Sequence, residues 1–110
     1  MMVAYGHGTF VQDANRFTGQ IVLEEYRLCL RRDGEDLAPT FIVLDKIERI
    51  RRRGRELWIH VKPSLTLAYW AMIKGEARYM DDLTRELVAR RGLSKRFLRR
   101  EWVDTSFHEI

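Results

Sequence analysis

The segment over residues 76–91 constrains the fold most, because it has the period of an amphipathic helix and follows a series of short alternating segments. Its apolar stripe consists of Ala77, Met80, Leu83, Thr84, Leu87 and Val88. Charges match the helix dipole, with Asp81 and Asp82 early and Arg90 and Arg91 late. Gly92 then acts as a stop signal, and Leu93 can pack back onto Val88. A helix that follows strands needs an apolar sheet surface to cover.

Alternation of apolar and polar residues predicts strands in the part of the chain before this helix. The expected strands cover residues 17–25, 26–32, 40–44, 47–52 and 57–61, with a bend at residues 45–46 and a hairpin turn at Gly54. In the last strand Leu57, Ile59 and Val61 face inward, whereas Trp58, His60 and Lys62 face outward. Residues 1–16 show no periodicity, and we expect them to form a flexible leader.

Residues 40–53 and 65–73 each fit both a strand period and a helix period. We favour strands in both, because Leu65, Leu67 and Tyr69 begin an alternating run. A helix at residues 65–73, with Ser64 as its N-cap, would instead give an α+β domain that ends in a helical hairpin. If residues 65–73 form an edge strand, they become a candidate for pairing with a second copy in a homo-oligomer.

Length and composition indicate one globular domain. The chain has 110 residues, of which 45% are hydrophobic and 33% charged, and this length leaves no room for a second core. The single cysteine, Cys29, lies in an apolar run and is expected to be a buried small side chain. A lone cysteine fits a reducing compartment, and the first residues lack a signal peptide, so we expect a cytoplasmic location. No apolar run is long enough for a transmembrane segment.

The order of these segments resembles the pleckstrin-homology-like superfold, in particular its bacterial and GRAM-type members. Residues 20–31, 41–50 and 57–61, followed by the helix, carry the resemblance. It implies a mainly β (α+β) domain over residues 17–93, in which a small antiparallel barrel or sandwich is capped by one C-terminal amphipathic helix. Phosphoinositide-binding members place basic residues around the first hairpin. The corresponding region here, residues 24–27, is partly acidic, which argues against a lipid receptor.

Basic charge is concentrated in the second half of the chain. Residues 1–48 carry five basic and eight acidic side chains, a net charge of −3, and residues 49–110 carry fifteen and eight, a net charge of +7. The densest cluster consists of Arg49, Arg51, Arg52, Arg53 and Arg55. Crowded arginines repel one another unless anions or carboxylates neutralise them. The cluster is therefore either a solvated turn, neutralised in part by Glu48 and Glu56, or a site for an anionic partner.

A second basic segment occupies residues 94–110, which we expect to be a basic and aromatic tail. Its basic side chains and one tryptophan either contact a membrane surface or a partner, or the tail folds back and packs on the domain through Phe97 and Trp102. The residues of the possible tail contact are Lys95, Arg96, Arg99, Arg100 and Trp102. Trp58 and Trp70 lie on the faces of their strands that point away from the expected core, where they pack or anchor a partner. No spacing of histidine, cysteine or nucleophile predicts a catalytic site, a metal site or a cofactor.

These patterns predict a non-enzymatic binding or scaffolding module. Its arginine-rich hairpin would bind a protein partner or, weakly, an anionic lipid surface. The alternative is a nucleic-acid-binding domain that uses the same arginines together with the tryptophans.

Overall fold

The computed structural model describes residues 2–34, 39–91, 93–99 and 102–107, and the side chains of residues 2–34 and 39–90. The elements in chain order are β1 (Val3–Gln12), β2 (Asn15–Leu23), β3 (Arg27–Arg32), β4 (Thr40–Val43), η1 (Leu44–Lys46), β5 (Ile47–Arg53), β6 (Glu56–Val61), β7 (Tyr69–Lys74), α1 (Ala77–Arg91), β8 (Leu93–Arg99) and β9 (Trp102–Phe107). The domain is therefore mainly β with one α-helix among the described elements, as the sequence predicts.

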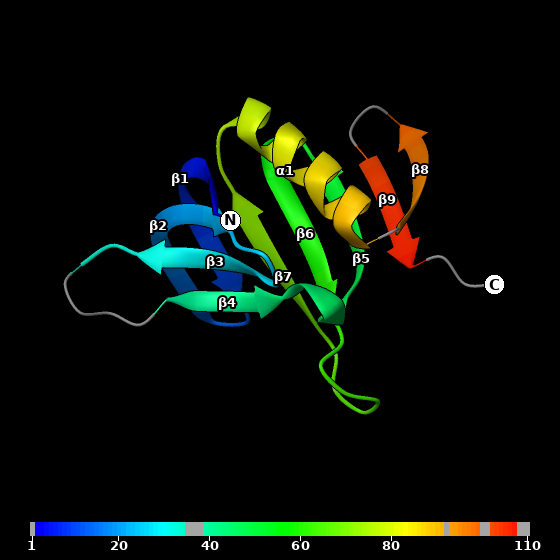
Figure 1. The fold of residues 1–110 in the computed structure, drawn as a ribbon, viewed down its shortest axis with the longest axis horizontal. Helices are drawn as coiled ribbons and strands as arrows, with labels where there is room; N and C mark the ends of the chain where they lie inside the picture. Colours follow the sequence, from blue (N-terminus) through cyan, green and yellow to red (C-terminus); the bar gives the residue numbers. More distant parts are fainter. Residues whose placement is uncertain (1, 35–38, 92, 100–101, 108–110) are drawn as a thin grey trace.

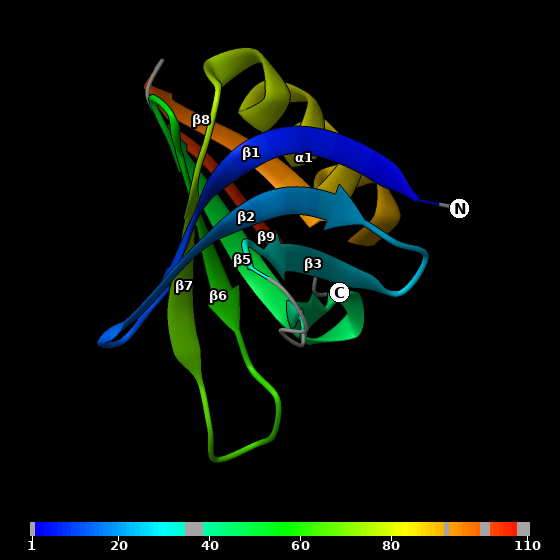
Figure 2. The same ribbon diagram turned by 90° about the vertical axis from the view of Figure 1, so that its left-hand side faces the viewer.

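The strands form one antiparallel sheet in the order β4-β3-β2-β1-β7-β6-β5-β9-β8. Two meanders, β1–β4 and β5–β7, are joined where β1 pairs with β7. The long strands β1 and β2 bend over the core, and α1 crosses the same side of the sheet (Figures 1 and 2). Between β4 and β8 no pairing closes the sheet in the described part of the chain, so the sheet is open.

The core lies between the curved sheet and α1. Met80, Leu83 and Leu87 of the helix are fully buried against inward side chains from the strands of both meanders. In β6 these are Leu57, Ile59 and Val61, as the alternation predicts. Apolar burial of this kind is the main stabilising term in a domain of this size. The helix therefore covers the apolar face of the open sheet, which would otherwise be exposed to solvent.

Both ambiguous segments contain strands. Residues 40–53 form β4, the turn η1 and β5, so the bend expected at residues 45–46 is confirmed. Residues 69–74 form β7, which excludes the C-terminal helical hairpin, whereas residues 65–68 belong to the loop before that strand. Because β7 pairs with β1 on one side and β6 on the other, it is not an edge strand. The expected route to a homo-oligomer through this strand is therefore wrong.

The expected flexible leader is also wrong, because Val3–Gln12 form β1 in the middle of the sheet. A bulge between Ala4 and His7, with Gly6 at φ 79°, shifts the register of the inward side chains. Tyr5 and Phe10 are therefore both buried, although they are five positions apart and uninterrupted alternation would place them on opposite faces. Beyond the helix, the expected tail contains the strands β8 and β9, which extend the sheet beside β5.

The helix begins at Ala77, and its first turn carries no acidic residue. Asp81 forms an ion pair with Arg52 and Asp82 with Arg85, so the helix dipole does not account for these two aspartates. At the other end, Arg90 donates to the backbone oxygen of Glu24 at 2.8 Å, which ties the helix to the turn between β2 and β3. Gly92 and the side chain of Leu93 lie outside the described residues.

Asp33 joins the first three strands on the surface. Its Oδ2 accepts hydrogen bonds from His7 Nε2 at 2.8 Å and from Thr18 Oγ1 at 3.0 Å. The hydrogen bond from His7, followed by that from Thr18, lowers the pKa of the Asp33 carboxyl below its usual value of 3.8.

This lowered pKa predicts a pH-dependent difference between the wild type and an Asp33→Asn variant. A carboxyl with a depressed folded-state pKa stabilises the fold above its unfolded-state pKa, and this contribution disappears as the pH falls through the folded-state pKa. We therefore expect the wild type to be slightly more stable than the variant at pH 7, and the two to converge below about pH 4. Urea midpoints at pH 7 and pH 3 measure this, and an unchanged difference at pH 3 would contradict it.

Candidate functional site

The arginine cluster does not form one site, because alternation along β5 sends its members to two faces. Arg52 points inward and is only 8% exposed, whereas Arg49, Arg51 and Arg53 lie on the face away from α1. Arg55 follows the hairpin turn at Gly54, whose φ of 58° lies in the left-handed region that glycine tolerates.

Arg52 and Arg55 bind other parts of the chain. The guanidinium of Arg52 donates to the backbone oxygen of Gly54 at 2.8 Å and of Ala77 at 3.2 Å, and it forms an ion pair with Asp81. Arg55 Nε donates to the Gly75 oxygen at 3.0 Å. Both arginines therefore hold the β5–β6 turn against the start of α1. Arg52 is buried by this role, whereas Arg55 remains exposed.

The outward arginines lie on a surface that we call the tryptophan face, formed by β5, β6 and β7. Directly paired residues of an antiparallel sheet share a face, so the register arranges these side chains in rows. The rows are Arg53, Glu56 and Lys74; Arg51, Trp58 and Met72; and Arg49, His60 and Trp70. The arginines thus line β5 beside two tryptophans that sequence alternation already places on the outward side.

A groove of about 370 Å³ opens in this face between Arg51, Arg53, Glu56, Trp58 and Trp70. Trp58 Nε1 donates to Glu56 Oε1 at 3.1 Å, and the guanidinium carbon of Arg51 lies 5.4 Å from the centre of the Trp70 ring. Both tryptophans are half-buried, so each leaves part of its ring for contact. Cation–π contact and the indole hydrogen bond hold the side chains in place before a ligand arrives.

The far end of the face carries a carboxylate. His60 Nδ1 lies 3.6 Å from Glu48 Oε1, and the His60 ring packs at 4.9 Å from Trp70. Along the opposite side, β9 pairs with β5 so that Asp104 stands across from Arg51 in the register. Glu48 and Glu56 therefore place carboxylates on the same face as the arginines, and the face is mixed in charge.

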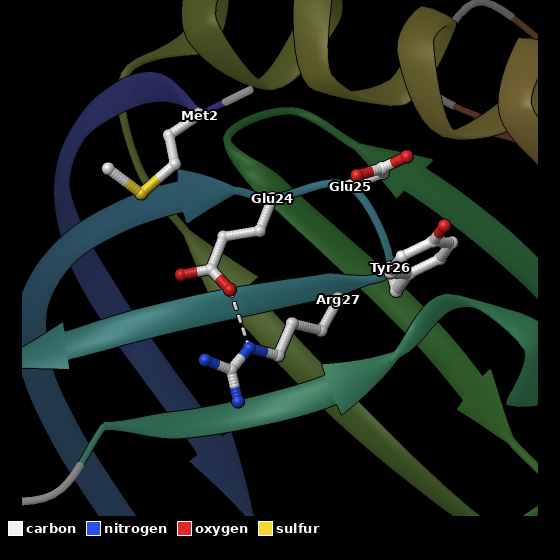
Figure 3. Close-up of a pocket in the computed structure, with 5 residues that line it drawn as sticks. All are labelled: Met2, Glu24, Glu25, Tyr26 and Arg27. Atoms are coloured by element: carbon white, nitrogen blue, oxygen red, sulfur yellow. Dashed lines mark hydrogen bonds and ion pairs between the residues drawn. The ribbon is translucent and has the colours of Figure 1, made fainter.

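A second depression of about 440 Å³ lies at the β2–β3 turn, lined by Met2, Glu24, Glu25, Tyr26 and Arg27. Figure 3 shows Glu24 and Arg27 directed toward each other, with Nε to Oε1 at 2.5 Å. The hydrogen bond from Arg27 lowers the pKa of the Glu24 carboxyl. Glu24 and Arg27 therefore partner each other, whereas the exposed Glu25 also lines the depression. Tyr26 is exposed there.

Cys29 is buried on the strand that follows this turn. Burial, reinforced by the nearby Glu24 carboxylate, raises the pKa of the thiol, so the protonated form prevails at neutral pH. The thiolate is the reactive form of cysteine. The expectation of a buried small side chain is confirmed, because only 2% of Cys29 is exposed.

The expected tail contacts cannot be placed. Lys95, Arg96, Arg99 and Trp102 belong to β8 and β9, but their side chains lie outside the described part, and Arg100 lies outside it altogether. In the portion with described side chains, no three histidine, cysteine or carboxylate groups are gathered as metal ligands. No described helix has the length and apolar character to span a bilayer.

Comparison of the chain with known proteins finds no matching family model, no matching curated protein and no matching solved structure.

Proposed function

We propose that this chain is a non-enzymatic binding module whose tryptophan face docks a protein partner. The observation that carries the proposal is the groove in which the half-buried Trp58 and Trp70 lie beside Arg51 and Arg53. Tryptophan and arginine are the residues most enriched among those that dominate binding energy at protein interfaces. The partner that fits is an apolar segment with acidic side chains, because apolar groups would cover the indole rings and carboxylates would reach the arginines of β5.

A nucleic-acid strand is the second candidate, because indole rings beside guanidinium groups also stack on bases. The carboxylate of Glu56 counts against it, since Glu56 lines the groove together with Arg51 and Arg53 and would repel a phosphate backbone. Glu48 lies at the opposite end of the same face, near His60. The mixed charge of the face therefore favours the protein partner.

The fold relationship is part of the same proposal. Seven antiparallel strands followed by a helix that enters their core have the element order of a pleckstrin-homology-like domain. In the structure the first hairpin turn lies between β1 and β2, near Asp13 and Arg16, rather than at residues 24–27. Neither turn is rich in basic side chains, so a ligand site at the first hairpin is not part of the proposal.

The test begins with peptides selected from a random library against the full chain. We expect the selected peptides to bind Arg53→Gln at least about fivefold more weakly, and Trp58→Ala at least about 30-fold more weakly, than the wild type. Arg85→Gln on the outer side of α1 is the matched control, because it removes the same charge from another exposed side chain. Titration calorimetry measures the affinities, and thermal midpoints confirm that each variant folds.

Equal binding by all variants would show that the tryptophan face is not the docking surface. A single-stranded oligonucleotide serves as the competing probe. If it binds the wild type at low salt, and its affinity falls steeply as salt rises because phosphate contacts release counterions, the nucleic-acid candidate replaces the protein partner.

A further inference from the structure

The loop between β6 and β7 projects away from the body of the domain (Figures 1 and 2). This loop carries two exposed leucines: Leu65 is 93% exposed and Leu67 is 55% exposed. Single apolar side chains on a surface are ordinary, but two leucines on one projecting loop form a local apolar tip. This tip takes no part in the groove between Trp58 and Trp70, so the proposed partner site does not account for it.

The charges around the tip favour a lipid surface as the group that covers it. Residues 57–75 contain no aspartate or glutamate, so no carboxylate would enter the bilayer with the leucines. At the base of the loop Lys62 Nζ lies 4.0 Å from Glu48 Oε2. Asp45 and Lys46 of η1 precede Glu48 in the chain. The basic and acidic groups at the base balance one another, so neither attraction nor repulsion by anionic headgroups dominates.

Insertion needs to be shallow, because backbone groups of an irregular loop require water and only the leucine side chains can enter the acyl region. If the tip instead docked into a pocket of a protein, carboxylates could stand beside the leucines.

We infer that the β6–β7 loop inserts Leu65 and Leu67 into the surface of a lipid bilayer, and that this contact depends on the leucines rather than on anionic lipid. Two leucines provide weak, reversible attachment, with half of the protein bound at on the order of 1 mM lipid. The contact is independent of the arginines on the tryptophan face.

Vesicle co-sedimentation tests the inference with the full chain. We expect the wild type to sediment with phosphatidylcholine vesicles at millimolar lipid, and to do so within about twofold as well as with vesicles that also contain phosphatidylserine. A Leu65→Ser, Leu67→Ser double variant is expected to bind both kinds of vesicle at least about tenfold more weakly. Leu65→Ile is expected to retain binding, because it keeps the apolar area of the tip.

Phe41→Ser is the matched control, because Phe41 is another exposed apolar side chain, on the edge strand β4, and its loss should leave vesicle binding unchanged. Thermal midpoints verify that the variants fold. The inference is overturned if the wild type stays in the supernatant with both vesicles, or if the double variant sediments like the wild type. Sedimentation that requires phosphatidylserine and is lost in Arg53→Gln would also overturn it, because it assigns the contact to the arginines.

Discussion

Replacing Gly19 by alanine is expected to lower the free energy of unfolding by about 3 kcal/mol or more. A Cβ atom at this position would lie 2.0 Å from the backbone oxygen of Arg31 and 2.6 Å from its carbonyl carbon, both in the neighbouring strand β3. Rotation of a side chain cannot relieve a clash with backbone, so β2 and β3 would have to separate. A Cβ atom added at Gly8, the direct partner of Gly19 on β1, would lie 2.5 Å from the Lys74 oxygen of β7.

The loss expected at Gly19 is a large part of the total stability of a small domain, which is on the order of 5–15 kcal/mol. Urea denaturation followed by circular dichroism measures it. Gly54→Ala is the control, because Gly54 has no neighbour within 4 Å of an added Cβ and its left-handed φ alone should cost about 1 kcal/mol. If Gly19→Ala unfolds at the same urea concentration as the wild type, the close approach of β2 and β3 is refuted.

The second large effect is expected for Arg52→Met, with a loss of about 2–3 kcal/mol in the free energy of unfolding. Methionine keeps much of the buried aliphatic stem but leaves the carbonyl groups of Gly54 and Ala77 without this donor. Asp81→Asn should cost less, because Asp81 is 57% exposed on its side chain and water can replace part of the ion pair.

Arg53→Met provides the comparison, because Arg53 is the next residue along β5 and is exposed. Its substitution should change stability by less than about 0.5 kcal/mol. Thermal and urea unfolding of the two variants therefore separate an arginine that supports the fold from one that is available to a partner. Equal stability of Arg52→Met and Arg53→Met would contradict the internal role of Arg52.

Strands with uninterrupted alternation could be predicted from the sequence, whereas those with interrupted alternation could not. Residues 57–61 alternate without exception, and their inward and outward faces are as expected. In β1 the bulge at Gly6 moves Tyr5 and Phe10 onto the same side, and Gly8 occupies a buried position without a side chain. Both features erase the two-residue period, so a central strand resembles an irregular leader.

The sequence predicts which residue types form the candidate site, but it does not predict how their side chains are arranged in space. Arg51, Arg52 and Arg53 are equivalent in the sequence, and the partner that draws Arg52 inward, Asp81, lies on the helix and far along the chain. The outward position of Trp58 followed from alternation, but its groove requires Trp70 of the next strand. Leu65 and Leu67 continue the alternation of β7, so the sequence predicts a strand there. In the structure the pairing of β7 with β6 ends at Tyr69, and the two leucines lie in the loop.

The pairing of β1 with β7 has a consequence for the order of folding. In the described part of the chain, strand pairing between the two meanders runs from Thr9 with Lys74 to Gln12 with Ala71, although about sixty residues separate these strands in the chain. Each meander can assemble from contacts between neighbouring strands, at little cost in loop-closure entropy. The pairing of β1 with β7 instead brings together residues that are far apart in the chain. During synthesis the first meander must therefore wait, with its β1 edge unprotected, until residue 74 has left the ribosome.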